Sequence, residues 1–221
     1  MASIWAERSP QRLGCDQSLH HRCNMNEVLK NIYERRSVRS YKDQAPKDEE
    51  LKEIVKAGTF APNGTNAQGL RFVVISDSAL LKKYSMLAKE LFVATIKKQV
   101  EKVPADKAEG MNRMMRTLSN PDFNIFYDAP TLILVLANPS CLTPVEDGSV
   151  AAENMMLAAW SMGIGSCWIG FANPLQHSPE FMAEVGIPPD HKLIAPIIFG
   201  YPKKAQSNGN RNEPEILKWI H

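Results

Sequence analysis

Two spacings of hydrophobic residues recur along the chain, and they predict which segments fold as strands and which as helices. Short apolar runs bounded by turn residues predict strands at 70–75, 130–137 and 191–202, and a short strand or an extended turn at 166–171. The run at 130–137 is apolar at nearly every position, which is typical of a central strand buried on both faces. Apolar residues that recur every three or four positions predict helices at 26–35, about 47–58, 79–102, 149–162, 178–185 and 215–220. Because strands and helices mix along the chain, we expect a three-layer domain of the α+β or α/β class.

Two segments lack a clear pattern. Residues 1–24 are polar and basic without sustained periodicity, and they contain no continuous apolar core of a secretory signal. We expect them to be a disordered extension ahead of a single domain at 25–221. Within 103–127, Met111, Met114 and Met115 lie at helical spacing ahead of an aromatic loop. A methionine stripe is most often part of a core, and the alternative is a mobile cap over a substrate pocket.

Composition narrows the class of protein. A formal net charge of +2 over 221 residues gives no general attraction to nucleic acid or to an anionic membrane. No window approaches the roughly 18 consecutive apolar residues that a membrane helix needs. The four cysteines include no CxxC pair, so neither an iron–sulfur cluster nor a redox dithiol is indicated. Two of them lie in the N-terminal segment and two in apolar surroundings, which suits a reducing cytoplasm. We therefore expect a soluble cytoplasmic protein that binds neither nucleic acid nor membrane. No metal site is expected either, because the spacing of four N-terminal residues is not a zinc pattern: Cys15, His20, His21 and Cys23.

The densest positive charge lies at 34–42, directly after an amphipathic run at 28–33. Arg35, Arg36 and Arg39 fall within five residues of one another there. The planar guanidinium of arginine makes paired hydrogen bonds to phosphate oxygens, and Ser37 adds a short donor beside them. The local pattern leaves two interpretations open, a binding seat for an anion and a solvated basic turn.

The common catalytic motifs are absent from the sequence. There is no GxGxxG after a strand, no GxxxxGK[ST], no GxSxG and no HExxH. A polar loop of turn residues and amides at 61–69 precedes the strand at 70–75. The sequence thus offers groups that bind anions and amides without an evident acid–base pair. A protein of this kind often takes its chemistry from a cofactor.

Four segments, in order, resemble the nitroreductase family of flavin enzymes. They are the arginine segment 35–39, the loop 61–68, the stretch 154–159 that runs into 163–170, and 200–202 with Arg211 downstream. The likeness covers about residues 26–212. Each segment alone is a weak signal, whereas the four together are a strong one. The chain departs from the family at Gly69-Leu70, where relatives often have Pro-Trp, and at 103–127, which has no clear match.

The resemblance implies an α+β homodimer with FMN held non-covalently at the subunit interface, and a three-layer α/β/α fold around a mixed, mainly antiparallel sheet. Arg35, Arg36, Ser37 and Arg39 would hold the flavin phosphate and ring edge, and Arg211 would close on the phosphate. A loop would reach the flavin from the partner subunit through Pro62, Asn63, Gly64, Asn66 and Gln68. One side of the ring would be lined by Cys167, Trp168, Ile169 and Gly170.

The activity that the resemblance implies is a two-step transfer of hydride at one site. NADH or NADPH would donate to FMN, and an electron-poor acceptor such as a nitroaromatic, a quinone or another flavin would then be reduced. No side chain is required as catalytic acid or base. Two alternatives stay open: a specialised flavin enzyme of the same fold (a dehydrogenase, a dehalogenase or a flavin-fragmenting enzyme), and a non-enzymatic flavin-binding module.

Overall fold

A four-stranded antiparallel sheet forms the centre of the computed structural model, which describes residues 26–207 and 209–221. The strand order is β1-β2-β4-β3. The strands are β1 (Leu70–Ile75), β2 (Thr131–Ala137), β3 (Gly165–Trp168) and β4 (Lys192–Gly200). Every residue of β2 is buried, as its continuous apolar sequence predicts for a strand covered on both faces.

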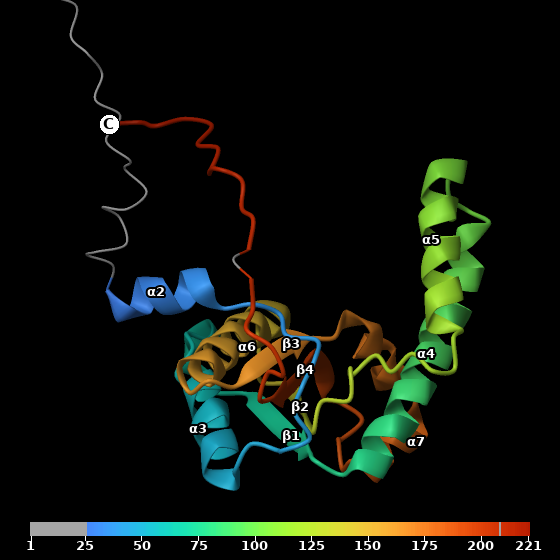
Figure 1. Cartoon of the computed structure of the whole chain (residues 1–221), viewed down its shortest axis with the longest axis horizontal. Coiled ribbons are helices and arrows are strands. Elements are labelled where there is room, and N and C mark those ends of the chain that lie inside the picture. The colour runs from blue at the N-terminus through green and yellow to red at the C-terminus, as the bar shows by residue number, and fades with distance from the viewer. Residues whose placement is uncertain (1–25, 208) are drawn as a thin grey trace, which may run out of the picture.

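Helices cover both faces of the sheet (Figure 1). Successive residues of β2 point to opposite faces, so that Ile133 and Val135 pack on one side and Leu132, Leu134 and Leu136 on the other. The first side is covered by α3 (Asp48–Thr59) and α6 (Pro144–Ser161). The second is covered by α4 (Ser78–Val100), the 3₁₀ helix η2 (Gly170–His177) and α7 (Pro179–Glu184). The expected three-layer α+β fold is confirmed.

The parallel component of the expected mixed sheet is small. The four strands pair only as antiparallel neighbours. In the part of the chain that the structure describes, parallel pairing is limited to an isolated bridge between Ser37 and Ser166, where Val38 N donates to Ser166 O at 2.9 Å. This bridge attaches the arginine segment to the outer strand β3.

Helices α4 and α5 (Ala105–Leu118) stand out from the body as a pair (Figure 1). Asp77 begins α4, because its side chain accepts a hydrogen bond from Leu80 N at 2.8 Å. Met111, Met114 and Met115 do lie on a helix, α5, and the core takes in Leu118 at the C-terminal end of that helix. Leu118 is buried, whereas Met114 is 37% exposed.

Two expected boundaries and one expected helix are wrong. Helix α6 begins at Pro144 rather than near 149, since proline fits the first helical position. The strand expected at 166–171 ends at Trp168, and η2 begins at Gly170. The helix expected at 215–220 is absent, because six residues without a packing partner make an unstable helix. The prediction that residues 1–24 form a disordered extension concerns residues outside those that the structure describes.

No helix among the described residues is both long and apolar enough to cross a lipid bilayer. These residues also contain no group of three or more His, Cys, Asp or Glu side chains placed to hold a metal ion.

The packing of α6 on the sheet yields a stability prediction. A Cβ at Gly148 would lie 2.5 Å from Ile194 Cγ2, so Gly148→Ala should lower the free energy of unfolding by about 1–3 kcal/mol through overpacking. The matched control is Gly110→Ala in α5, where a Cβ meets no atom within 4 Å. That variant should raise stability by about 0.5–1 kcal/mol, because alanine favours a helix interior. Urea unfolding monitored by circular dichroism measures both, and equal effects in the two variants would contradict the packing argument.

Candidate cofactor site

The arginine segment leaves α2 (Glu27–Glu34) and runs along the edge of the sheet. Lys42 N donates to Tyr201 O at 2.8 Å, which fixes the far end of the segment as the Ser166 bridge fixes its start. Val38 and Tyr41 are buried, whereas Ser37 and Arg39 are exposed. The segment therefore anchors itself by its apolar residues and turns its polar ones outward.

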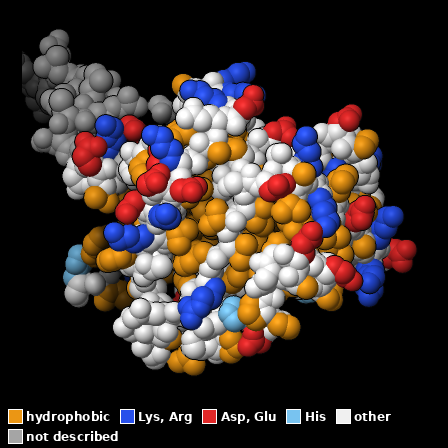
Figure 2. Space-filling view, turned by 90° about the horizontal axis from the view of Figure 1, so that it is seen from below, with side chains coloured by type: hydrophobic (Ala, Val, Ile, Leu, Met, Phe, Trp, Pro, Cys, Tyr) orange, Lys and Arg blue, Asp and Glu red, His pale blue; other side chains and the backbone are white. Residues whose placement is uncertain are grey.

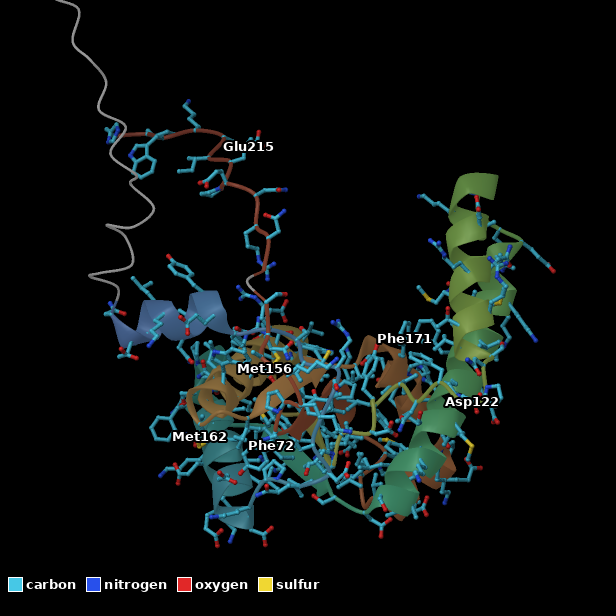
Figure 3. All side chains as sticks on the ribbon, in the orientation of Figure 1. Phe72, Asp122, Met156, Met162, Phe171 and Glu215 are labelled. Atoms are coloured by element: carbon cyan, nitrogen blue, oxygen red, sulfur yellow. The ribbon has the colours of Figure 1, made fainter. Side chains whose placement is uncertain are left out.

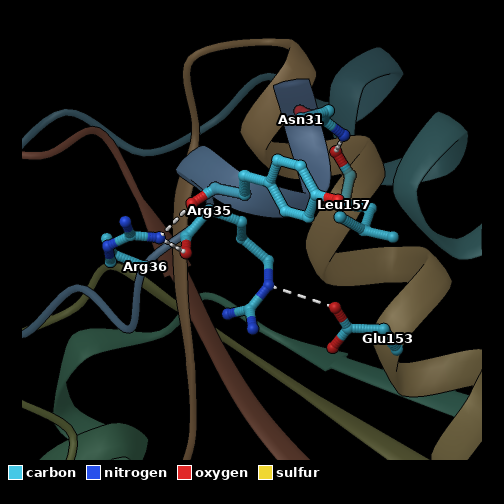
Figure 4. Close-up of polar contacts among 6 residues, drawn as sticks. Asn31, Arg35, Arg36, Glu153 and Leu157 are labelled. Atoms are coloured by element: carbon cyan, nitrogen blue, oxygen red, sulfur yellow. Dashed lines mark hydrogen bonds and ion pairs between the residues drawn. The ribbon is translucent and has the colours of Figure 1, made fainter. Parts of the chain in front are cut away.

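Arg35 connects the end of α2 to α6. Its Nε donates to Glu153 Oε1 on α6 at 3.1 Å, and its side chain is only 18% exposed (Figure 4). Asn31 Nδ2 donates to Leu157 O at 2.9 Å one turn further along α6. These two bonds hold α2 on α6, so one edge of the Arg35 guanidinium is already occupied by a carboxylate.

Among the described residues, the side-chain hydrogen bonds of Arg36 all go to backbone oxygens. Its Nη1 donates to Tyr33 O at 2.6 Å and to Arg35 O at 2.7 Å, and its Nε donates to Ser207 O at 3.3 Å. Carbonyl oxygens orient the guanidinium without neutralising its charge. The Ser207 contact brings the segment after β4 to this arginine. Arg211 itself is exposed, and its side-chain hydrogen bond goes to the neighbouring Asn210 O at 3.0 Å.

Arg39 lies beside a cavity of about 360 Å³. Its Cζ is 5.9 Å from the centre of the Tyr127 ring, and within residues 26–207 and 209–221 it forms no ion pair. The cavity is lined by this arginine and by Phe92, Tyr127, Cys167, Trp168, Ile169, Gly170 and Phe171. The fold thus joins two of the predicted sets of site residues, which are 128 positions apart in the sequence (Arg39 to Cys167).

Cys167 is not placed to act as a nucleophile. Its side chain is buried, and burial raises the pKa of the thiol above its ordinary value, although Arg39, Ser37 and Arg35 act in the opposite direction. A thiol with a raised pKa stays protonated near neutral pH and reacts slowly.

The amide loop at 61–69 is strained and tightly anchored. Thr65, Asn66 and Gln68 have positive φ angles of 54°, 55° and 49°, which residues other than glycine rarely adopt. Asn63 Oδ1 accepts a hydrogen bond from Gln68 N at 2.9 Å and holds the loop closed. Strain of this kind persists only where the surroundings fix the backbone.

Asp147 on α6 supplies that anchor. Its buried Oδ1 accepts hydrogen bonds from Gly64 N at 3.0 Å and from Thr143 Oγ1 at 2.9 Å. The cavity at Arg39 contains no residue of this loop, so one protomer does not bring the loop and Arg39 into a shared cavity. That the loop reaches the cofactor of the partner subunit stays a prediction, as do the individual roles of Pro62, Asn63, Gly64, Asn66 and Gln68.

A family model described as the nitroreductase family matches residues 32–201. The chain belongs to the nitroreductase family. A protein of Archaeoglobus fulgidus, named for its expected NADH dehydrogenase and NAD(P)H nitroreductase activities, is 31% identical over 184 residues, which are 81% of this chain and 87% of that protein. The iodotyrosine deiodinase of Thermotoga neapolitana is 26% identical over 192 residues, 84% of this chain and 96% of that protein.

A solved structure agrees with the fold. The nitroreductase of Bacteroides fragilis with bound FMN superposes with a TM-score of 0.72 at 28% identity, over 89% of this chain and 99% of that one. The nitroreductase-family fold expected from the four sequence segments is confirmed.

The residues at the cavity fit a flavin mononucleotide. Arg36 and Arg39 are cations without a carboxylate partner among the described residues, as a dianionic phosphate requires. A Cβ at Gly170 would meet no atom within 4 Å, so a flat ring can approach the backbone on that side of the cavity.

Several residues around the site were not singled out in the sequence. Asp147 and Glu153 are two of the three acids on a mainly apolar helix, and that contrast was the available signal. Phe92 and Phe171, whose rings meet edge to face at 5.1 Å, gave none, because their neighbourhood arises only when α4 packs on η2.

The Asp147 anchor yields the second prediction. Asp147→Ala should lower the free energy of unfolding by about 2–4 kcal/mol, because two hydrogen bonds to a carboxylate are lost. Asp147→Asn keeps an oxygen acceptor and should lose less than half of that. The control is Glu146→Ala, an exposed acid in the first turn of the same helix, which should cost less than about 1 kcal/mol. Urea unfolding compares the three variants; a loss in Asp147→Ala no larger than in the control would rule out the anchor.

Proposed function

We propose that this chain is an FMN-dependent oxidoreductase that uses NADH or NADPH to reduce electron-poor small molecules, with nitroaromatics, quinones and flavins as the acceptor classes. The observation that carries the proposal is the charge of Arg39, which forms no ion pair among the described residues, beside the cavity lined by 167–171, in a chain of the nitroreductase family. The buried free cysteines Cys141 and Cys167 fit a reducing compartment such as the cytoplasm.

The protein's own contribution is positioning and electrostatics. FMN, when bound, supplies the hydride chemistry by accepting from a nicotinamide and passing to an acceptor. Arg36, Ser37 and Arg39 would hold its anionic groups. Arg211 would also reach the phosphate, because Arg36 binds the segment after β4 at Ser207. The backbone at 167–170 and the aromatic rings at 92 and 171 would orient the flat ring and keep water from it.

No side chain at the cavity is needed as a proton donor. Two buried acids, the thiol of Cys167 and the phenol of Tyr41, are influenced by the charge of Arg39. Burial raises the pKa of each, and the Tyr41 hydroxyl already donates to Val38 O at 2.6 Å. We therefore assign the supply of protons to solvent and give no side chain a role as catalytic acid or base.

We propose a homodimer with FMN at its interface because the described surface leaves large apolar areas uncovered. On α2, Val28 is 68% and Tyr33 56% exposed. The C-terminal segment runs away from the body, with Glu215 far from the sheet (Figure 3), and it exposes Leu217 at 91% and Trp219 at 68%. Exposed apolar patches of this extent mark an interaction surface.

A groove of about 710 Å³ between α3 and β1 suits that segment of a second copy. Leu51, Val55 and Phe72 line its floor, and Lys52, Lys56 and Arg71 lie beside them. The C-terminal segment carries Glu213 and Glu215 among its apolar residues, so the charges are complementary. Apolar side chains also gather on the side of the molecule where β1 and α3 lie (Figure 2).

A second candidate is a reductive dehalogenase. The 26% identity to an iodotyrosine deiodinase over 84% of the chain favours it over the other specialised flavin enzymes. The two functions differ in how fast nicotinamide reacts, so one measurement separates them.

The test is the visible spectrum of the purified protein under anaerobic conditions. Flavin absorbance that bleaches within seconds of adding NADH or NADPH supports the reductase and identifies its donor. Bound flavin that bleaches only slowly favours the dehalogenase, and protein that binds no FMN would overturn both. Arg39→Ala should weaken FMN binding about 10-fold or more while the fold persists. Arg116→Ala, an exposed arginine on α5, is the charge-matched control and should bind FMN as wild type does.

The dimer has its own test. Deletion of residues 213–221 keeps Arg211 and removes the exposed apolar segment. It should convert the dimer to monomer at micromolar concentration in sedimentation velocity, with loss of FMN. A full-length protein that sediments as a monomer would refute the dimer, and a truncated protein that stays dimeric would exclude this segment from the interface.

A further inference from the structure

A lysine is buried in the middle of α4. Lys89 is 7% exposed, and its Nζ donates hydrogen bonds to Asn120 O at 3.0 Å and to Phe123 O at 2.7 Å. Within the chain segments that the structure describes, it forms no ion pair. Burying an ammonium group is unfavourable unless its donors are well satisfied. An apolar side chain would fill this place, between Leu118 and Pro121, without that penalty. What lysine adds is a pair of hydrogen bonds to two backbone carbonyls of one turn.

A serine one turn earlier on α4 holds the same segment. Ser85 is 3% exposed, and its Oγ accepts a hydrogen bond from Ile125 N at 3.1 Å. Residues four apart lie on one face of a helix, so Ser85 and Lys89 form a single polar stripe. Together they bind residues 120–125, which follow α5, to α4; Asp122 lies beside α4 in Figure 3.

The bound segment consists of successive turns and contains no strand. Asn120 Oδ1 accepts a hydrogen bond from Asp122 N at 3.0 Å, and Asn124 Oδ1 accepts one from Phe126 N at 2.9 Å. Ile125 and Phe126 are fully buried. The next two residues, Tyr127 and Asp128, both have φ = 53°. Two consecutive left-handed residues that are not glycine are held by their surroundings. Here Tyr127 N donates to Asn124 O at 3.0 Å and Asn124 Nδ2 donates to Asp128 Oδ1 at 2.9 Å, in a turn that Ser85 and Lys89 attach to α4.

This backbone conformation decides where the Tyr127 ring lies. The ring lines the cavity, with Arg39 Cζ 5.9 Å from its centre and the Phe123 ring 5.9 Å away in an edge-to-face arrangement. Phe171 also lines the cavity and lies between the sheet and α4 (Figure 3). Its ring meets the Phe92 ring of α4 edge to face, with centres 5.1 Å apart. A change in the turn at 120–125 therefore moves the Tyr127 part of the cavity lining.

We propose that Lys89 and Ser85 are positioning residues that fix the wall formed by Tyr127, against which Phe123 packs, and so determine which aromatic acceptors the cavity admits. The inference rests on the proposed function, because it assigns the acceptor to this cavity. Neither residue touches the cavity itself; both act through the backbone of 120–128.

The experiment is a double-variant cycle on the FMN-loaded, full-length protein. Lys89→Met removes the charge at nearly constant volume, and Tyr127→Ala removes the wall. Kinetics with 4-nitrobenzoate and 1,4-benzoquinone should show KM raised about 10-fold in each single variant, with kcat within about twofold of wild type. Ferricyanide, which needs no aromatic wall, should keep its KM. The double variant should match Tyr127→Ala alone, because both changes act on one contact.

Two readouts do not depend on turnover. Hydrogen exchange of peptides covering 119–129 should be faster in Lys89→Met, and the Kd of 4-nitrobenzoate from calorimetry should rise as KM does. Lys82→Met, an exposed lysine on the same helix, is the matched control and should change neither. If Lys89→Met fails to fold, Ser85→Ala tests the same attachment and should show the same pattern with a smaller KM effect.

Unchanged exchange at 119–129 in Lys89→Met, or KM effects that add in the double variant, would overturn the proposal. Failure of the proposed function has a different signature, namely wild-type protein whose flavin is not reduced by NADH or NADPH. In that case hydrogen exchange and the Kd of 4-nitrobenzoate still decide whether Lys89 positions the wall.

Discussion

The site depends on two carboxylates carried by one buried helix. Helix α6 packs its apolar face on the sheet and keeps Asp147 and Glu153, six residues apart, for polar contacts with other segments. Asp147 holds the amide loop, and Glu153 holds Arg35 and, through it, the end of α2. Both contacts are charge-assisted hydrogen bonds, which are shorter and stronger than neutral ones. Two segments far apart in the chain thereby take their positions from a single rigid element, so an error in the placement of α6 would disturb both.

The three arginines of the segment at 35–39 differ in how far their charge is already used. Arg35 is paired with a carboxylate, Arg36 is oriented by carbonyl oxygens, and Arg39 forms no ion pair among the described residues. Electrostatic attraction for an anion therefore increases from the α2 end of the segment toward the cavity. A uniform cluster of exposed arginines would attract anions anywhere along its length, whereas this gradient directs the charged part of a ligand.

Sequence patterns were sufficient where the physics is local or strongly apolar. The continuous run at 130–137 identified the central strand, and the four segments together identified the family. The patterns failed where tertiary contacts decide. The helix expected at 215–220 has the right spacing but nothing to pack on, and the strand expected at 166–171 is shortened where η2 begins at Gly170. Lys89 could not be predicted, because a lysine buried against two backbone carbonyls has the same local pattern as a solvated one.

The outer edge of β1 affects the tendency of the protein to aggregate in the cell. Within the residues that the structure describes, β1 pairs only with β2, so one row of its backbone N–H and C=O groups is open and Val74 is 45% exposed. An open edge of this kind is a template for pairing with any other extended chain. The chain is therefore most prone to aggregate through this edge while nothing covers it. A higher expression level raises the concentration of such open edges, so the balance between chaperone capacity and synthesis rate would govern the yield of folded protein.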